Sequence, residues 1–238
     1  MKKPMLIAHR GLSSQAPENT MAAFRLAINT GADGIETDAH LTLDGKIVLI
    51  HDENTMRTTG QNGAVARMSL AELRELDAGD WYDDCFADER IPELWQLLEL
   101  LKPTNMVLNI ELKNSIERYP GLEQAVLGEI NRFGMINRII FSSFNHASMA
   151  LVKVLESKAE TALLYDGVLH EPAVYSRLCR ADGLHPMRKT VDEALARECR
   201  QAGLKLRPWT VDNPAEAERL TAYGVEAIIS NSPDELFS

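Results

Sequence analysis

Residues 33–52 read DGIETDAHLTLDGKIVLIHD and contain two strand-like runs joined by a short polar segment. The first run covers residues 33–38 and the second covers residues 46–50. The segment between them is too short for a parallel crossover, which needs about a dozen residues or more. We therefore predict that the second run returns antiparallel beside the first, as a hairpin.

The turn of this hairpin is predicted at Asp44-Gly45, a pair typical of two-residue type I′ turns. Counting outward from that turn, the register places His51 opposite Asp38. The hairpin is thus expected to bring an acid beside a histidine.

Along the rest of the chain, short β-like runs alternate with longer amphipathic stretches. The strand candidates are residues 5–8, 33–38, 106–111, 138–142, 160–164, 182–184, 204–209 and 226–230. Helix candidates lie between them at 18–29, 92–101, 122–133, 146–156, 191–201 and 214–223. A series of eight β-then-α units predicts an α/β fold of the (β/α)8 TIM barrel type rather than an open sheet.

Residues 53–90 interrupt this alternation. The segment is rich in Gly, Asp and Thr and is much longer than a single connecting helix requires. We predict a single domain over residues 1–238, in which residues 53–90 form a small inserted subdomain over the barrel mouth.

The composition excludes several functional classes. The chain has 238 residues, 45% hydrophobic and 25% charged, as in an ordinary globular protein. Its formal net charge of −10 disfavours nucleic acid and anionic membranes as partners. Cys85, Cys179 and Cys199 have no metal-ligand spacing and describe no disulfide framework. No apolar run matches a membrane span or a signal peptide, so we expect a cytoplasmic protein, with its oligomeric state open.

Acidic residues lie where the predicted strands end, and strand ends form the active-site face of a TIM barrel. Glu36 and Asp38 are two residues apart and share a face, as do Glu111 and Lys113. Carboxylates gathered at one mouth repel one another unless a cation binds, and all-oxygen ligation favours Mg²⁺ or Ca²⁺ over zinc. Spacing alone equally allows these acids to form ion pairs with Arg10 and Lys113.

Two histidines, His9 and His51, also follow strand ends, and imidazole is suited to general acid or base catalysis near neutral pH. Arg10 and Lys113 are candidates to bind an anionic group. Trp209 is a candidate apolar wall for a substrate, or an aromatic side chain that fills the barrel. A cation, two basic side chains and two histidines together indicate phosphoryl chemistry.

These residues, in this order, resemble the glycerophosphodiester phosphodiesterase family over almost the whole chain. The matching motifs are His9-Arg10-Gly11, Pro17-Glu18-Asn19-Thr20, residues 34–38, residues 42–45, His51-Asp52, Ile91-Pro92, Glu111-Leu112-Lys113, Ser143-Phe144 and Trp209-Thr210. The resemblance implies hydrolysis of glycerophosphodiesters to sn-glycerol 3-phosphate and an alcohol by a compact cytoplasmic bacterial enzyme.

The resemblance also implies roles for single residues. By position, the family's metal ligands, acid/base pair and phosphate contacts correspond to Glu36, Asp38 and Glu111, to His9 and His51, and to Arg10 and Lys113. Which histidine is the acid stays open. The nucleophile also stays open, as water or the substrate's own 2-hydroxyl, and so do the head group and the physiological cation.

The chain departs from the family pattern at a few positions. Ala39 and Leu43 lie on the hairpin, where Val and Lys are common. Ser230-Asn231 replaces a common Thr-Asp near the last strand, which affects helix capping or a hydrogen bond at the mouth.

Three rival functions remain. A phospholipase of the same fold needs an apolar or basic membrane-docking loop, and the Asp-rich segment from Asp77 to Glu89 argues against one. An enolase-type lyase or isomerase would use Lys113 as its base. A catalytically silent barrel would bind phosphate esters without turnover.

Overall fold

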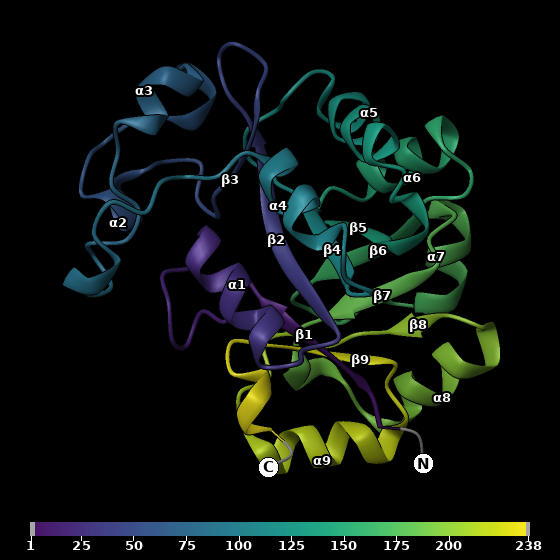
Figure 1. Cartoon of the computed structure of the whole chain (residues 1–238). Coiled ribbons are helices and arrows are strands. Elements are labelled where there is room, and N and C mark those ends of the chain that lie inside the picture. The colour runs from purple at the N-terminus through teal and green to yellow at the C-terminus, as the bar shows by residue number, and fades with distance from the viewer. Residues whose placement is uncertain (1–2, 237–238) are drawn as a thin grey trace.

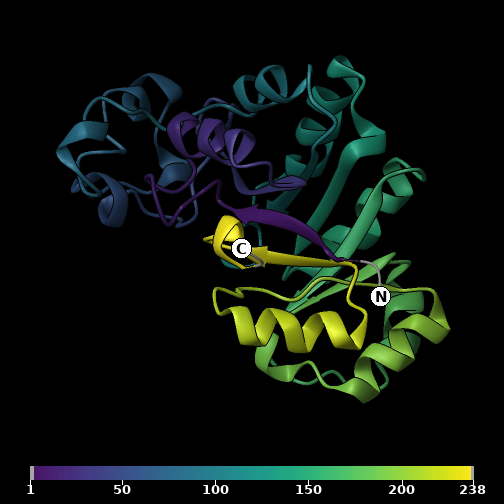
Figure 2. The same cartoon turned by 60° about the horizontal axis from the view of Figure 1, so that its bottom comes forward.

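The structure, a computed structural model, describes residues 3–236, in which parallel strands form an almost closed barrel surrounded by helices (Figures 1 and 2). The barrel strands of this part of the chain are β1 (Met5–His9), β2 (Gly34–Leu41), β4 (Val107–Leu112), β5 (Ile139–Ser143), β6 (Glu160–Tyr165), β7 (Gly183–Pro186), β8 (Lys205–Leu206) and β9 (Ala227–Ser230). They pair in the order β8-β7-β6-β5-β4-β2-β1-β9. At the remaining seam, the backbone N–H of Val211 donates to the carbonyl of Ile229 at 3.0 Å. The predicted TIM barrel is confirmed.

The helices connect successive strands along the outside of the barrel. They are α1 (Met21–Asn29), α4 (Leu94–Leu101), α5 (Leu122–Phe133), α6 (His146–Leu155), α7 (Pro172–Cys179), α8 (Glu193–Ala202) and α9 (Pro214–Tyr223). Polar caps fix where they begin: the side chain of Thr20 accepts from the N–H of Ala23, and that of Asn213 accepts from the N–H of Glu216. In residues 3–236, none of the helices has the length and apolar character of a membrane span.

Two elements in the second half differ from the sequence-based expectation. Regular β8 ends at Leu206 rather than at residue 209: the N–H groups of Arg207 and Trp209 still donate to β7, but Pro208 has no N–H to donate toward β9. α7 was not among the predicted helices. Its buried residues include Ala173 and Ser176, whereas Leu178 is 77% exposed, so its apolar periodicity points away from the barrel.

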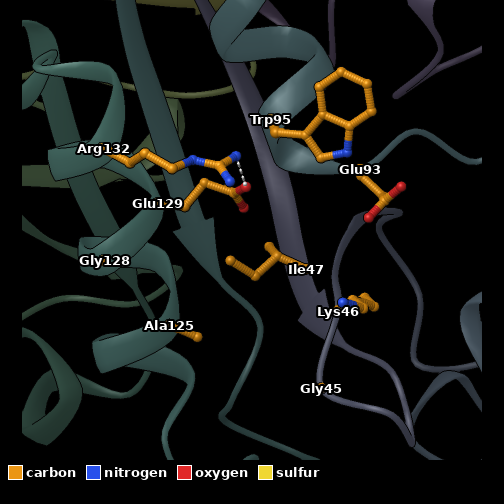
Figure 3. Close-up of a pocket in the computed structure, with 9 residues that line it drawn as sticks. All are labelled: Gly45, Lys46, Ile47, Glu93, Trp95, Ala125, Gly128, Glu129 and Arg132. Carbon is orange, nitrogen blue, oxygen red and sulfur yellow. Dashed lines mark hydrogen bonds and ion pairs between the residues drawn. The ribbon is translucent and has the colours of Figure 1, made fainter.

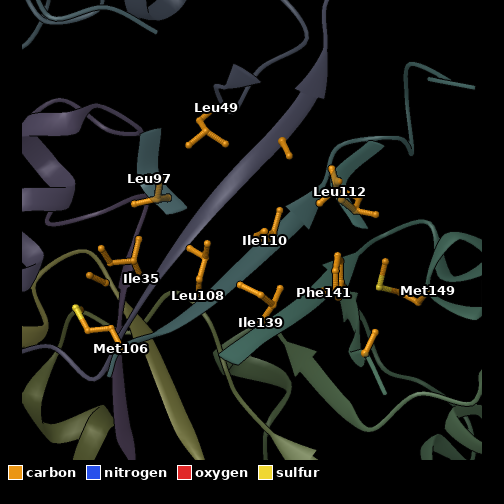
Figure 4. Close-up of a cluster of buried hydrophobic side chains, with 14 of the residues drawn as sticks. Ile35, Leu49, Leu97, Met106, Leu108, Ile110, Leu112, Ile139, Phe141 and Met149 are labelled. Atoms are coloured by element: carbon orange, nitrogen blue, oxygen red, sulfur yellow. The ribbon is translucent and has the colours of Figure 1, made fainter. Parts of the chain in front are cut away.

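The main core lies between the strands and the helices outside them. Figure 4 shows Ile35, Leu108 and Ile110 on the strands beside Leu97 of α4, with Phe141 beside Met149 of α6. On β4, and on β2 apart from Thr37, apolar residues alternate with polar ones, so the strands that pack against the helices also direct carboxylates into the barrel.

The hairpin forms, but its predicted register is wrong by one residue. β3 (Ile47–Leu49) pairs antiparallel with β2, with Ala39 opposite Leu49. The N–H of Gly45 donates to Thr42 at 3.0 Å and Gly45 has φ +72°, which makes a three-residue loop ending in a left-handed glycine. The extra loop residue shifts the pairing, so the backbone carbonyl of Asp38 accepts from the N–H of Ile50, and Asp38 does not lie opposite His51.

Residues 53–90 project from the β3 side of the barrel (Figure 1). They include two short helices, α2 (Met56–Thr59) and α3 (Leu70–Arg74). A separate apolar cluster joins Val65 and Leu73 of this segment to Val48 of β3. The segment also contacts the β1–α1 loop, where the hydroxyl of Tyr82 donates to the carbonyl of Ser14 at 2.6 Å.

Candidate active site

A cavity of about 180 Å³ opens among the C-terminal ends of the barrel strands. It is lined by His9, Arg10, Glu36, His51, Asn109, Glu111, Phe144, Leu164, Trp209, Thr210 and Ile229. The structure therefore brings together six of the eight site residues expected from sequence. The other two, Asp38 and Lys113, lie directly behind the lining, where Lys113 Nζ is 3.0 Å from Glu111 and 3.8 Å from Asp38.

The carboxylates meet because β2 and β4 are neighbours in the barrel. Their register pairs Asp38 with Glu111 and Glu36 with Asn109. One oxygen from each of Glu36, Asp38 and Glu111 lies within 4.8 Å of the others, and all three residues are buried. The shared strand face predicted from the i, i+2 spacing is what produces this cluster.

Burial and charge act differently on the three acids. Burial raises the pKa of Glu36 well above its usual range, and Asp38 adds to the effect. Burial likewise raises the pKa of Glu111 to about 7. Burial alone would also raise the pKa of Asp38, but Arg10 at 3.5 Å and Lys113 at 3.8 Å hold that pKa well below its usual range. Two cationic side chains thus face three buried carboxylates.

The cluster fits a divalent cation. The Oδ1 atom of Asp38 is buried and accepts no hydrogen bond within residues 3–236. Unpaired buried carboxylate oxygens are costly, and a bound cation removes both that cost and the mutual repulsion of the acids. The donors are all oxygens, which suits a hard cation.

His9 is positioned from the β9 side of the mouth. The amide nitrogen of Asn231 donates to Asp212 at 2.8 Å, and a carboxylate only accepts, so Asn231 must turn its Oδ1 toward His9. His9 Nδ1 lies 2.7 Å from that oxygen and therefore carries a proton. Nε2 is the ring nitrogen that does not bind Asn231. Burial, reinforced by Arg10, lowers the pKa of His9 to about 4, so the ring is neutral near neutral pH.

His51 is positioned from the opposite side, by Asp52, which precedes the 53–90 segment, and by Arg57, which lies within it. Its Nδ1 donates to Asp52 at 2.5 Å, so here too Nε2 is the ring nitrogen that does not bind the positioning residue. Arg57 donates to Asp52 at 2.6 Å and forms two hydrogen bonds with Glu18 at 2.7 and 2.9 Å. Although burial acts the other way, the hydrogen bonds from Arg57 and His51 lower the pKa of Asp52 to about 2.

The turn after β1 brings a guanidinium and a backbone donor to the acids. Arg10 donates from its backbone N–H to Glu36 at 3.0 Å and from its side chain to Glu18 at 2.9 Å. The next residue, Gly11, has φ +80°, and a Cβ there would lie 2.7 Å from the carbonyl carbon of Ala23. Only glycine allows this close approach to α1.

The wall of the cavity opposite the acids is apolar. The rings of Phe144 and Trp209 meet edge to face at 5.8 Å, and Leu164 and Ile229 complete this side. Trp209 donates from its indole nitrogen to the carbonyl of His185 at 2.7 Å, which orients the ring. The structure thus places Trp209 on the cavity surface.

Sequence reasoning gave no role to several residues of this site. The sequence marks Asn231 only as a departure from the family pattern near the last strand, and nothing in the sequence pairs Asn231 with His9. Asp212 and Arg57 gave no sequence signal. Asn109 lies two residues before Glu111 on the same face of β4, a spacing that identifies it once the strand is known.

A larger cavity, of about 630 Å³, lies between the hairpin turn, the start of α4 and α5 (Figure 3). Figure 3 shows Trp95 and Ile47 on its sides and Arg132 paired with Glu129 on one helix, at 3.0 Å. Its described lining contains no histidine. Its acids, Glu93 and Glu129, do not belong to the carboxylate group that, within residues 3–236, is close enough to share a metal ion. The chemistry of the lining, rather than its volume, locates the candidate site.

The fold and the site together define a class, a TIM-barrel enzyme whose mouth combines a carboxylate cluster that fits a divalent cation, basic side chains and two imidazoles. Residues 9–235 match the glycerophosphoryl diester phosphodiesterase family. The chain belongs to this family.

Named relatives and solved structures agree. A glycerophosphodiester phosphodiesterase of Caldanaerobacter subterraneus subsp. tengcongensis is 42% identical over 99% of this chain and 97% of its own. One from Bacillus altitudinis is 38% identical over 96% and 95%. The structure is similar to that of an Oleispira antarctica phosphodiesterase in complex with the product sn-glycerol-3-phosphate, with a TM-score of 0.91, 31% identity and coverage of 98% and 95%.

Proposed function

We propose that this protein hydrolyses glycerophosphodiesters to sn-glycerol 3-phosphate and an alcohol. The observation that carries the proposal is the cavity lined by two carboxylates, a guanidinium and two imidazoles, with Asp38 and Lys113 completing the charged cluster directly behind it. The product bound to the Oleispira antarctica relative, at 31% identity and a TM-score of 0.91, supports the same substrate class.

Glu36, Asp38 and Glu111 are proposed to bind the divalent cation, with Mg²⁺ and Ca²⁺ favoured by the oxygen donors. When bound, the cation supplies charge stabilisation to the phosphodiester as its charge develops. Arg10 and Lys113 bind the phosphate oxygens. The Nε atom of Arg10 is buried, lies 3.5 Å from Asp38 and makes no hydrogen bond within the described residues, so its N–H is an unsatisfied donor beside the cluster.

His9 and His51 form the proposed acid/base pair. One ring removes the proton of the nucleophile as its oxygen bonds to phosphorus, and the other protonates the alcohol oxygen as its bond to phosphorus breaks. Both rings use Nδ1 for a hydrogen bond to the protein, so Nε2 is the atom that exchanges protons in each. The nucleophile is either water or the substrate's own 2-hydroxyl, which would give a cyclic phosphate first.

The apolar wall is proposed to contact the carbon skeleton of the substrate. Trp209 and Phe144 present ring surface toward the cavity, opposite the charged residues. A substrate with a charged phosphate and uncharged carbon atoms is thereby bound in one orientation, because each end has a matching side of the cavity.

The test is release of glycerol 3-phosphate from glycerophosphocholine by the purified protein, with EDTA and then with Mg²⁺ or Ca²⁺ restored. We expect no turnover in EDTA and recovery with at least one cation. The Glu111→Gln variant should respond poorly to added cation. Phosphorus NMR during the reaction identifies the nucleophile, since a cyclic phosphate appears only when the 2-hydroxyl attacks. Absence of product with every cation would contradict the proposal.

A further inference from the structure

A buried pair, His40 and Tyr119, lies directly behind His51. Nε2 of His40 is 3.2 Å from the backbone carbonyl oxygen of His51, and Nδ1 is 2.8 Å from the hydroxyl of Tyr119. His40 is 0% exposed and Tyr119 is 8% exposed, and their rings meet edge to face at 5.5 Å. Neither residue lines the cavity, and the proposed chemistry uses neither.

The partners of His40 fix its proton. A backbone carbonyl only accepts, so Nε2 of His40 must carry the hydrogen. The ring is fully buried and has no carboxylate among these partners, so it is the neutral tautomer with hydrogen on Nε2, and Nδ1 is an acceptor. Tyr119 must therefore donate its hydroxyl proton to Nδ1. All the polar groups involved are satisfied in this single arrangement.

The backbone of His51 needs such a contact because the sheet ends before it. The last pairs of the hairpin ladder join Ala39 to Leu49, and the N–H of Ile50 then donates to Asp38 at 3.1 Å. His51 itself lies past the end of β3. Its carbonyl is tied to β2 by the ring of His40 instead of by a ladder hydrogen bond.

Tyr119 is itself fixed by the fold. It lies in the connection between β4 and α5, and its carbonyl accepts from the N–H of Leu122 at 3.1 Å. The same connection begins with Lys113, and the buried Asn114 anchors it by donating to Glu123 at 3.0 Å. The ring of His40 thus joins the β4 side of the mouth to the backbone of His51.

We propose that His40 is a positioning residue, which fixes the backbone of His51 while Tyr119 fixes the tautomer of His40. The inference rests on the acid/base role proposed for His51. Asp52 binds the ring of His51 at Nδ1 and His40 binds its carbonyl, so both ends of the residue are attached. This double attachment keeps Nε2 directed into the cavity, where small displacements of a catalytic group reduce the rate strongly.

The chain contains a matched control pair at α6 and α7. His146 has Nε2 2.8 Å from the carbonyl oxygen of Leu164 and Nδ1 3.0 Å from the hydroxyl of Tyr175, with ring centroids 5.5 Å apart. This pair repeats the hydrogen bonds of His40 and Tyr119, but the carbonyl that it binds belongs to Leu164 of the apolar wall, which has no part in proton transfer. Loss of the Tyr175 hydroxyl should therefore affect folding or KM without lowering kcat.

The experiment measures kcat and KM for glycerophosphocholine, with the preferred cation saturating, in Tyr119→Phe, His40→Gln, Tyr175→Phe and the double variant His40→Leu/Tyr119→Phe. In the double variant, the carbonyl of His51 is the one group of these contacts that loses its hydrogen-bond partner. We expect kcat of this variant to fall about 10- to 100-fold at nearly unchanged KM. The His40→Gln side chain retains an N–H donor and should recover most of the rate. Wild-type kcat in the double variant, or equal loss in His40→Gln, would overturn the inference.

Tyr119→Phe gives an independent answer if the double variant fails to fold. Its kcat should fall about fivefold, the effect of one lost hydrogen bond, while kcat of Tyr175→Phe stays at the wild-type level. Equal kcat in the two phenylalanine variants would contradict the proposal. The His51→Ala variant separates the two levels: normal turnover there removes the proposed role of His51 itself, whereas an inactive His51→Ala beside fully active His40 variants removes only the positioning role.

Discussion

The two sides of the mouth that position His9 and His51 achieve the same result with opposite chemistry. At His9 the hydrogen-bond acceptor is the neutral amide of Asn231, whose nitrogen donates to Asp212. At His51 the acceptor is the carboxylate of Asp52, whose oxygens accept from Arg57. Each ring presents an Nδ1 proton to the protein, which leaves Nε2 for the proposed proton transfer.

The difference indicates that the residue behind the acceptor, here called the outer partner, decides whether an amide or a carboxylate can accept from Nδ1 of the histidine. The outer partner is Asp212 at His9 and Arg57 at His51. An amide has both a donor and an acceptor end, and it serves His9 only because Asp212 takes the donor end. A carboxylate has acceptors on both oxygens, so at His51 the outer partner is the donor Arg57. Asn231, held by Asp212, thus gives His9 the same Nδ1–H tautomer that Asp52 gives His51.

The largest expected effect comes from removing the rings themselves. His9→Ala and His51→Ala should each lower kcat by about two to four decades, because each deletes one proton transfer. The double variant should be little worse than the more damaged single variant, since residues acting as a unit are not additive. Steady-state kinetics measure this, and circular dichroism verifies folding. Near-normal turnover in both single variants would contradict the paired role.

The next largest effect tests the outer partners. In Asp52→Asn, Arg57 attracts the amide oxygen, so the amide nitrogen faces His51 and favours the wrong tautomer. We expect kcat to fall by about 100-fold, although an amide does the same task beside His9. Wild-type kcat in Asp52→Asn would show that the outer donor is irrelevant and would remove the contrast between the two sides.

A smaller effect is expected at Arg57, which acts on His51 only through Asp52. Arg57→Met keeps much of the side-chain volume but removes the donors to Asp52 and Glu18. We expect kcat to fall about five- to tenfold, in line with the loss of one ordinary hydrogen bond, because Arg57 acts only through Asp52. The readout is kcat at saturating substrate, with cation affinity as the control. A drop as large as that of His51→Ala would place Arg57 at the substrate itself.

The smallest expected effect on turnover concerns the buried histidines. Their effect is on the free energy of unfolding and its dependence on pH. Burial is the largest cause of the lowered pKa of His9 and His40, each to about 4, and of His185. Unfolded imidazoles titrate near 6.5, so between pH 6.5 and about 4 the unfolded state binds protons that the folded state does not. The free energy of unfolding should therefore fall as the pH falls through this range.

His185→Gln isolates one of these protons, because burial and then Arg207, 3.3 Å from His185, are the causes of the lowered pKa of His185. The slope of unfolding free energy against pH should decrease by up to about 1.4 kcal/mol per pH unit, the value for one proton. Urea unfolding between pH 7.5 and 5 with saturating cation measures the slope. An unchanged slope would mean that His185 binds a proton equally in both states.

Much of the architecture followed from local patterns. The alternation of strand and helix predicted the barrel, and the i, i+2 spacing placed Glu36 and Asp38 on one face beside Glu111. Both inferences succeed because side-chain direction on a strand has a fixed period, and because parallel strands end on one side of a barrel. The roles of these residues in the reaction stay predictions.

Other features did not follow from local patterns. The hairpin register was wrong because Gly45 adopts a left-handed conformation in a three-residue loop, a choice that the Asp44-Gly45 pair does not settle alone. The helix α7 was missed because its exposed apolar residues contradict the usual periodicity.

By itself the sequence determined the barrel, the strand ends and the set of charged residues that converge there, since each depends on periodicities of a few residues. Only the tertiary structure decided which partner fixes each imidazole. His9 and Asn231 are 222 positions apart, and His40 meets Tyr119 across 79. Such contacts depend on the closure of the barrel and on the orientation of single side chains in its loops, which no local sequence pattern encodes.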